Sequence, residues 1–235
     1  DVRLIAAALA RRDGVGDVHI HGVSFWRSDV KDNLAARLPE RGDAPGLHIG
    51  LLHCAVGERP GHSRYAPCDL QDLRGKGYDY WALGHIHGFD VLAEDPWIVY
   101  AGSLQGRSFK PSDRGEHGAV VVEFDDDGIT GVRLQPIDVI RFEEVDVPID
   151  GITTTAELSD RVTAAGERVL ADAGEAAVVI RARLTGRSPL SSEISADRWG
   201  EGLCADLAEA ASANLIWAAV DIDVQPEVDL DALRA

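Results

Sequence analysis

Residues 78–88 read YDYWALGHIHG, and residues 47–54 read LHIGLLHC. Each stretch begins as an apolar run of the length of a strand, and histidines stand where the run ends: His85 and His87 in the first, His53 in the second. Short apolar runs bounded by turn signals are typical of buried strands. They predict strands over 47–54 and 78–83, and Gly84 allows a sharp turn where the second strand ends. The sequence therefore predicts a sheet that carries imidazoles at the ends of two strands.

The rest of the chain alternates between strand-like and helix-like segments, which places it in the α/β class. Before residue 139, further strands are expected at 18–25, 97–101, 119–124 and 129–136, and short helices at 30–38 and 69–76. After it, the pattern predicts strands at 142–149, 176–184 and 215–224, with helices at 153–173 and 197–212. We therefore expect one domain over 1–138 and a small α/β domain over 139–235.

Composition limits the class of protein. The 235 residues contain no apolar run of the length of a membrane helix, and the first residues lack the order of a signal peptide. Cysteines occur only at 54, 68 and 204 and form no CxxC pair, which indicates a reduced, cytoplasmic protein. The net charge of −17 argues against a passive DNA clamp, because nonspecific DNA binding relies on Lys and Arg.

Histidines are the candidate functional residues. His53 closes one strand, and His85 and His87 follow another, so that all three are expected at one edge of the sheet. Two histidines at i and i+2 on extended backbone project to the same side, and imidazole is a common metal ligand. His19 and His21 have the same spacing, so spacing alone does not choose between the pairs.

Other conspicuous side chains have simpler interpretations. His48 is expected at the surface and His117 in a structural role. Trp81 and Trp97 are expected in the core, as aromatic residues in strands usually are.

Four stretches in order carry a resemblance: GLLHC (50–54), PGHSRYAPCDLQDLRGKGYDYWALGHIHG (60–88), EDPWIVYAGSLQGRSF (94–109) and RGEHGAVVVEF (114–124). Together they resemble the calcineurin-like metallophosphoesterases, and most of all their DNA-repair exonuclease branch, the SbcD-like and YhaO-like proteins. The resemblance runs from about Gly22 to Phe124. It implies that 1–138 is the carboxyl half of a metallophosphoesterase β-sandwich with flanking helices, and that 139–235 is an α/β capping domain.

The resemblance also implies a site. It would hold two divalent metal ions, usually Mn, with His53 and His85 on one ion and His87 on the other. Gln105 and Arg107 match a loop of the family and are expected, with Lys110 and His62, to contact the substrate. The implied partners are DNA and an SbcC-type coiled-coil ATPase, and the family also includes homodimers.

The sequence departs from the family upstream of these motifs. The family's Asp-x-His, Gly-Asp-x-x-Asp and Gly-Asn-His-Asp motifs, which supply carboxylate ligands and a catalytic histidine, do not occur. The chain also contains no Met. We therefore expect a nuclease in the parent protein and no activity from this chain alone. Two alternatives stay open: a phosphatase or small phosphodiesterase of the same superfamily, and a non-catalytic binding or scaffold fragment.

Overall fold

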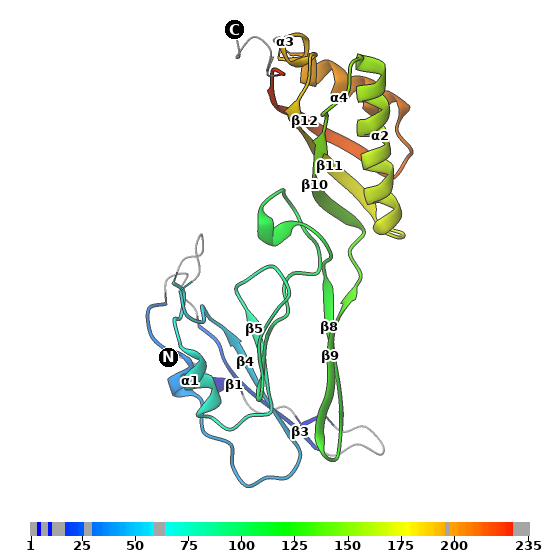
Figure 1. The fold of residues 1–235 in the computed structure, drawn as a ribbon. Coiled ribbons are helices and arrows are strands. Elements are labelled where there is room, and N and C mark those ends of the chain that lie inside the picture. Colours follow the sequence, from blue (N-terminus) through cyan, green and yellow to red (C-terminus); the bar gives the residue numbers. More distant parts are fainter. Residues whose placement is uncertain are drawn as a thin grey trace. The chain divides into compact units, whose positions relative to one another are not determined.

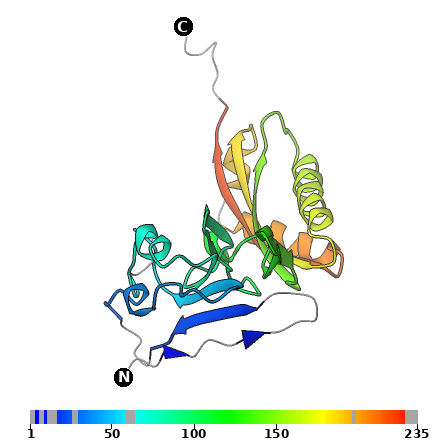
Figure 2. The same ribbon diagram turned by 90° about the horizontal axis from the view of Figure 1, so that it is seen from below.

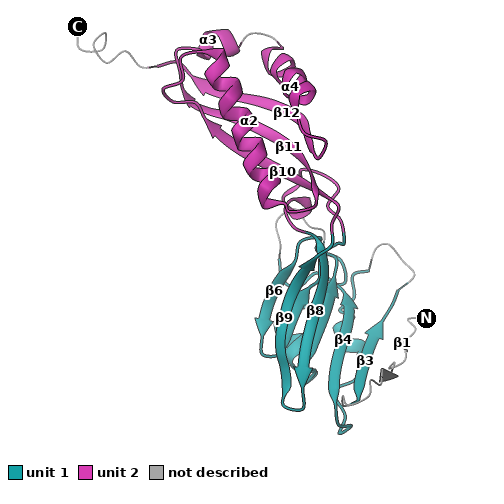
Figure 3. Cartoon of the chain, turned by 90° about the vertical axis from the view of Figure 1, so that its right-hand side faces the viewer, with its two compact units in different colours: residues 1–104, 117–137 teal, residues 105–116, 138–235 magenta. Residues whose placement is uncertain are grey.

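The α/β class is confirmed by a computed structural model, which describes residues 4–5, 9–10, 17–25, 30–58, 64–195 and 198–227 (Figure 1). The chain forms two units, one of residues 1–104 and 117–137 and the other of residues 105–116 and 138–235 (Figure 3). The strands of the first unit are β1 (Leu4–Ile5), β2 (Leu9–Ala10), β3 (Val18–Val23), β4 (Leu47–His53), β5 (Tyr80–Gly84), β6 (Asp90–Glu94), β7 (Trp97–Tyr100), β8 (Gly118–Asp125) and β9 (Gly128–Pro136). Its helices are the 3-10 turn η1 (Ala35–Arg37) and α1 (Leu70–Arg74).

The first unit is built on a mixed sheet with the strand order β1-β3-β4-β5-β7-β6. Strands β3, β4, β5 and β7 run parallel, whereas β1 and β2 pair antiparallel with β3, and β6 pairs antiparallel with β7. Parallel strands end at the same edge, so the carboxyl ends of these four strands are neighbours. Open α/β sheets bind ligands at this edge.

One face of this sheet carries the core of the first unit. The side chains of Leu52, Trp81 and Ile98 point into it and pack against η1 and α1. Trp81 is fully buried, and it lies over Gly50, where a Cβ atom would come within 2.4 Å of the indole ring. Trp81 therefore is a core residue, as expected, while Trp97 is only half-buried.

The second unit is a parallel sheet of β10 (Ile140–Pro148), β11 (Ala177–Arg187) and β12 (Leu215–Gln225), in that order. Helices α2 (Thr155–Asp172), α3 (Ser191–Ile194) and α4 (Trp199–Ala210) join the strands, and α2 lies along the sheet (Figure 1 and Figure 2). Residues 105–116, which contain the 3-10 turn η2 (Pro111–Asp113), also belong to this unit. Its core includes Leu158 and Val162 of α2 and Ile180 of β11.

Most expected elements are confirmed, but the expected helix over 30–38 is wrong. Only Ala35–Arg37 is helical there, as a single 3-10 turn. The Asn33 side chain accepts the Ala36 N–H at 3.2 Å, a local bond that competes with a longer helix. Pro39 then cannot continue a helix, since it has no N–H to donate.

Strand β6 and the short helix α3 were not expected. Strand β6 lies at the sheet edge, is half-buried and lacks a clear alternation, so its pairing with β7 decides its conformation rather than its own sequence. No helix among the described residues is long and apolar enough to cross a membrane.

Candidate functional site

Two of the expected histidines meet at the carboxyl edge of the first sheet. His53 is the last residue of β4 and pairs in register with Gly84, the last residue of β5. His85 follows directly, and its ring centroid lies 5.4 Å from that of His53. The charge of His87 also reaches His53 strongly enough to affect its pKa. The parallel register of β4 and β5 thus brings together the imidazoles of His53 and His85 from two separate stretches of sequence.

The backbone after β5 makes room for these rings. At Gly84, a Cβ atom would lie 3.0 Å from Nδ1 of His53, so a larger residue would push against that ring. His85 has a φ of 109°, which non-glycine residues rarely adopt. The expectation that His85 and His87 continue an extended strand is therefore wrong. A strained backbone that the surrounding fold maintains is typical of functional sites.

Two aromatic side chains that the sequence analysis missed pack against the imidazoles. The Tyr65 ring stacks on that of His85 at 5.9 Å and meets the edge of His53 at 5.5 Å. Phe25 contacts both Tyr65, at 4.9 Å, and His53, at 6.0 Å. The signal for Tyr65 lay inside the quoted stretch 60–88, but nothing local distinguishes it from an ordinary loop tyrosine.

The surroundings keep His53 neutral. Desolvation by the packed neighbours, followed by the charges of His85 and His87, holds the pKa of His53 below its ordinary value. A metal ion binds only the neutral form of imidazole. The direction of the shift therefore favours metal binding over protonation near neutral pH.

The described residues do not by themselves complete a metal site. Across residues 4–5, 9–10, 17–25, 30–58, 64–195 and 198–227, no group of three or more His, Cys, Asp or Glu side chains is arranged to hold a metal ion. The three imidazoles would offer nitrogen ligands, whereas a hard cation such as Mn²⁺ prefers oxygen.

A second histidine group occupies the opposite edge of the same sheet. His48 stacks between His19, at 4.5 Å, and His21, at 5.2 Å, and Tyr78 stacks on His21 at 4.6 Å. The Nε2 atom of His21 lies 3.1 Å from Nδ1 of His48, and Nε2 of His48 donates to the carbonyl of Ala44. The expectation that His48 lies at the surface is wrong, since it is only 2% exposed.

This second group predicts a pH-dependent stability. Burial, and then the charges of His48 and His19, hold the pKa of His21 below its ordinary value of 6.5. The unfolded chain therefore binds more protons than the folded chain as the pH falls through about 6.5, and the free energy of unfolding decreases there. We expect a lower urea midpoint at pH 5.5 than at pH 7.5. His21→Gln should make this pH dependence shallower, and an unchanged pH dependence in that variant would contradict the assignment.

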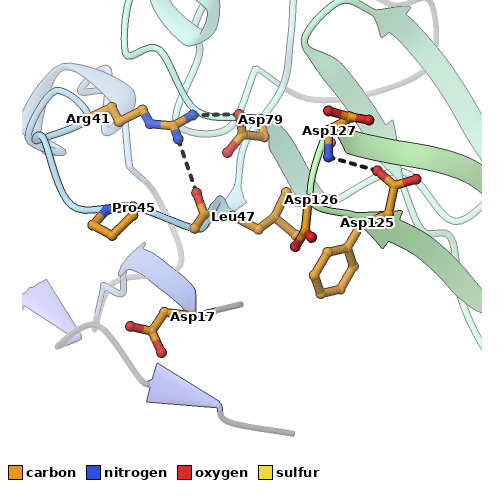
Figure 4. A pocket seen from close by; sticks show the side chains of 11 residues that line it. Asp17, Arg41, Pro45, Leu47, Asp79, Asp125, Asp126 and Asp127 are labelled. Atoms are coloured by element: carbon orange, nitrogen blue, oxygen red, sulfur yellow. Dashed lines mark hydrogen bonds and ion pairs between the residues drawn. The ribbon is translucent and has the colours of Figure 1, made fainter. Parts of the chain in front are cut away.

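A cavity of about 750 Å³ opens near this opposite edge, among residues that precede β3, β4 and β5 and the turn between β8 and β9 (Figure 4). Five aspartates line it: Asp17, Asp79, Asp125, Asp126 and Asp127. Arg41 is the cation in its lining, and it pairs with Asp79 at 2.5 Å. A cavity lined by so many carboxylates repels a phosphate group, and none of the histidines at the carboxyl edge belongs to its lining.

The residues expected to contact substrate lie in the second unit or outside the described residues. Gln105 donates to the carbonyls of Gly106 and Ile140 and accepts the N–H of Val139, so that it fastens its loop to the start of β10. Arg107 and Lys110 are exposed on this loop. His62 lies outside the described residues.

Comparison with known proteins connects the second unit to a family. The family model described as "Metallophosphoesterase YhaO, middle domain" matches residues 142–219. The chain is also 40% identical over 112 residues to a protein described as "Uncharacterized metallophosphoesterase YhaO" from Bacillus subtilis (strain 168). That alignment covers 47% of this chain and 27% of the YhaO protein, so the matched part of the chain spans about a quarter of its relative's length.

The YhaO middle-domain match covers α2, α3, α4 and β11 of the second unit, most of β10 and the first residues of β12. On the open face of that sheet, Arg181 pairs with Glu144 at 3.3 Å and with Asp221 at 3.7 Å, and Arg183 pairs with Asp146 at 2.9 Å. Arg181 and Arg183 of the central strand are thus paired with carboxylates of the neighbouring strands. This face of the second unit offers little net positive charge to a nucleic acid.

Proposed function

We propose that the complete protein is a metal-dependent phosphoesterase and that His53, His85 and His87 belong to its metal ligands. The observation that carries this proposal is the meeting of His53 and His85 at the carboxyl edge of the parallel strands, with His87 close behind. The similarity to YhaO supports the same reaction class. The carboxylate ligands would come from residues outside the described part of the chain.

The residues of this chain would act mainly by positioning. The register of β4 and β5 fixes where His53 and His85 stand, and Tyr65 holds the His85 ring from one side. The depressed pKa of His53 keeps its nitrogen available as a ligand. A bound divalent metal would supply the positive charge that phosphoester cleavage requires.

The substrate in this proposal is DNA, and the activity is exonucleolytic. Resemblance to the DNA-repair exonuclease branch supports this substrate, together with the exposed cations Arg107 and Lys110, which could contact phosphates. The same proposal includes two metal ions, with Mn²⁺ as their identity. It also includes an SbcC-type ATPase as the partner and a homodimer as the assembly. A phosphatase or small phosphodiesterase activity is the competing outcome.

The experiment compares the complete gene product with residues 1–235, each supplied with Mn²⁺. The substrates are bis(p-nitrophenyl) phosphate, p-nitrophenyl phosphate and linear double-stranded DNA. We expect the complete product to cleave the diester and the DNA, and residues 1–235 to be inactive. Loss of an outer partner of a metal ligand already costs about 10–100-fold. His85→Ala and His87→Ala should therefore each lower kcat/KM of the complete product at least about tenfold.

His19→Ala is the matched control. It removes a histidine of the same sheet from the opposite edge, where its Nε2 atom contacts only the carbonyl of Pro45 at 3.1 Å among the hydrogen bonds identified. This variant should retain wild-type kcat/KM. Equal activity of the His85 and His87 variants with wild type would refute the assignment, and cleavage of the monoester alone would replace the nuclease with a phosphatase.

A further inference from the structure

His117 is the buried histidine that the proposed site does not use. It precedes β8, is only 2% exposed, and lies in the first unit with the candidate ligands. Its Nδ1 atom is 3.0 Å from Oγ of Ser103 and 3.2 Å from the carbonyl oxygen of Ser103. Because a carbonyl oxygen can only accept, the second contact is a hydrogen bond in the tautomer that carries the ring proton on Nδ1.

The other nitrogen of this ring is unsatisfied. Nε2 of His117 is buried and has no hydrogen-bond partner among the described residues. A buried polar atom without a partner destabilises the fold and requires an explanation. An apolar side chain at position 117 would avoid the cost of the unpartnered Nε2 atom. The contact of Nδ1 with Ser103 therefore explains why a histidine stands at this position.

Ser103 in turn holds the loop that carries His87. The Ser103 N–H donates to the carbonyl of His87 at 2.8 Å. The preceding residue, Gly102, has a φ of +77°, and a Cβ atom there would lie 2.7 Å from the same carbonyl oxygen. Residues 102–103 are thus closed tightly over the backbone of His87, which lies outside any regular strand or helix.

We infer that His117 is a positioning residue that sets the place of the His87 imidazole relative to His53 and His85. The connection runs from the His117 ring to Ser103 and from the Ser103 N–H to the His87 carbonyl. His117 does not touch substrate or metal in this scheme. The inference rests on the proposed function for the role of His87, but the contacts that it invokes belong to this chain alone.

Two substitutions separate this role from simple packing. His117→Asn places an amide nitrogen near the position of Nδ1 and can still donate to the Ser103 carbonyl, whereas His117→Leu fills similar space without a donor. Backbone amide exchange of residues 1–235 is the first readout. We expect the Ser103 amide to exchange at least tenfold faster in His117→Leu and close to wild type in His117→Asn. The Val178 amide, which donates to Asn214 in the second unit, should not change in either variant.

Affinity of the complete gene product for Co²⁺ is the second readout, because Co²⁺ reports its ligands by visible absorption. His117→Leu should weaken Co²⁺ binding several-fold and His117→Asn should restore it. If His85→Ala and His87→Ala leave Co²⁺ binding unchanged, the proposed function fails. In that case amide exchange by itself tests whether His117 holds the loop through Ser103. If those variants lose Co²⁺ but His117→Leu matches wild type in both readouts, the positioning role is overturned and the proposed function stands.

Discussion

Gly102→Ala is expected to displace His87 and to lower the Co²⁺ affinity of the complete gene product by about 10–100-fold, because loss of the support of a metal ligand commonly costs that much. Two effects combine at this position. The φ of +77° costs a non-glycine residue about 1–2 kcal/mol. In addition, the new Cβ atom would lie 2.7 Å from the His87 carbonyl oxygen and 3.0 Å from the Phe89 nitrogen, both of them backbone atoms that cannot rotate away.

Gly115→Ala is the matched control for this prediction. Gly115 has the same φ of +77°, but nothing lies within 4 Å of the place that its Cβ atom would take, so only the backbone strain is added. Titration with Co²⁺ and urea unfolding of both variants separate strain from collision. Equal Co²⁺ affinities of the two variants would show that the contact of residue 102 with His87 does not shape the site.

A second glycine substitution, Gly166→Ala, should destabilise the second unit, although replacing glycine by alanine usually stabilises a helix. Alanine normally stabilises a helix relative to glycine by about 1 kcal/mol. At Gly166 in α2, however, the new Cβ atom would lie 2.5 Å from Cζ2 of Trp217 and 3.3 Å from Cδ2 of Leu215. Trp217 is buried in the core and cannot move freely, so we expect Gly166→Ala to destabilise the unit by about 1–3 kcal/mol through overpacking.

Gly202→Ala provides the comparison in the neighbouring helix α4. Gly202 is exposed and has nothing within 4 Å of its Cβ position, so this variant should be more stable than wild type by up to about 1 kcal/mol. The measurement is the urea midpoint of each variant, with unfolding monitored by tryptophan fluorescence. A stabilised Gly166→Ala protein would show that α2 can move away from Trp217 at little cost.

The sequence by itself determined the α/β class and most strands and helices, because apolar periodicity is a local property that each segment carries. It also predicted that the histidines at 53, 85 and 87 stand at strand ends, since an apolar run and a following glycine mark the end of a strand locally. The helix over 30–38 failed because the bond of the Asn33 side chain limits where it begins and Pro39 limits where it ends, which leaves a single turn. Strand β6 was missed because its structure comes from pairing with β7.

Only the tertiary structure decided which side chains meet. The register of β4 with β5 joins His53 to His85, the fold stacks Tyr65 on both, and the contact of His117 with Ser103 braces His87. The same sheet buries His48 at its opposite edge, where no local pattern separated it from a surface residue. These contacts join residues that are distant in sequence. Local periodicity carries no information about such pairs, because strand pairing and packing select them only when the chain folds.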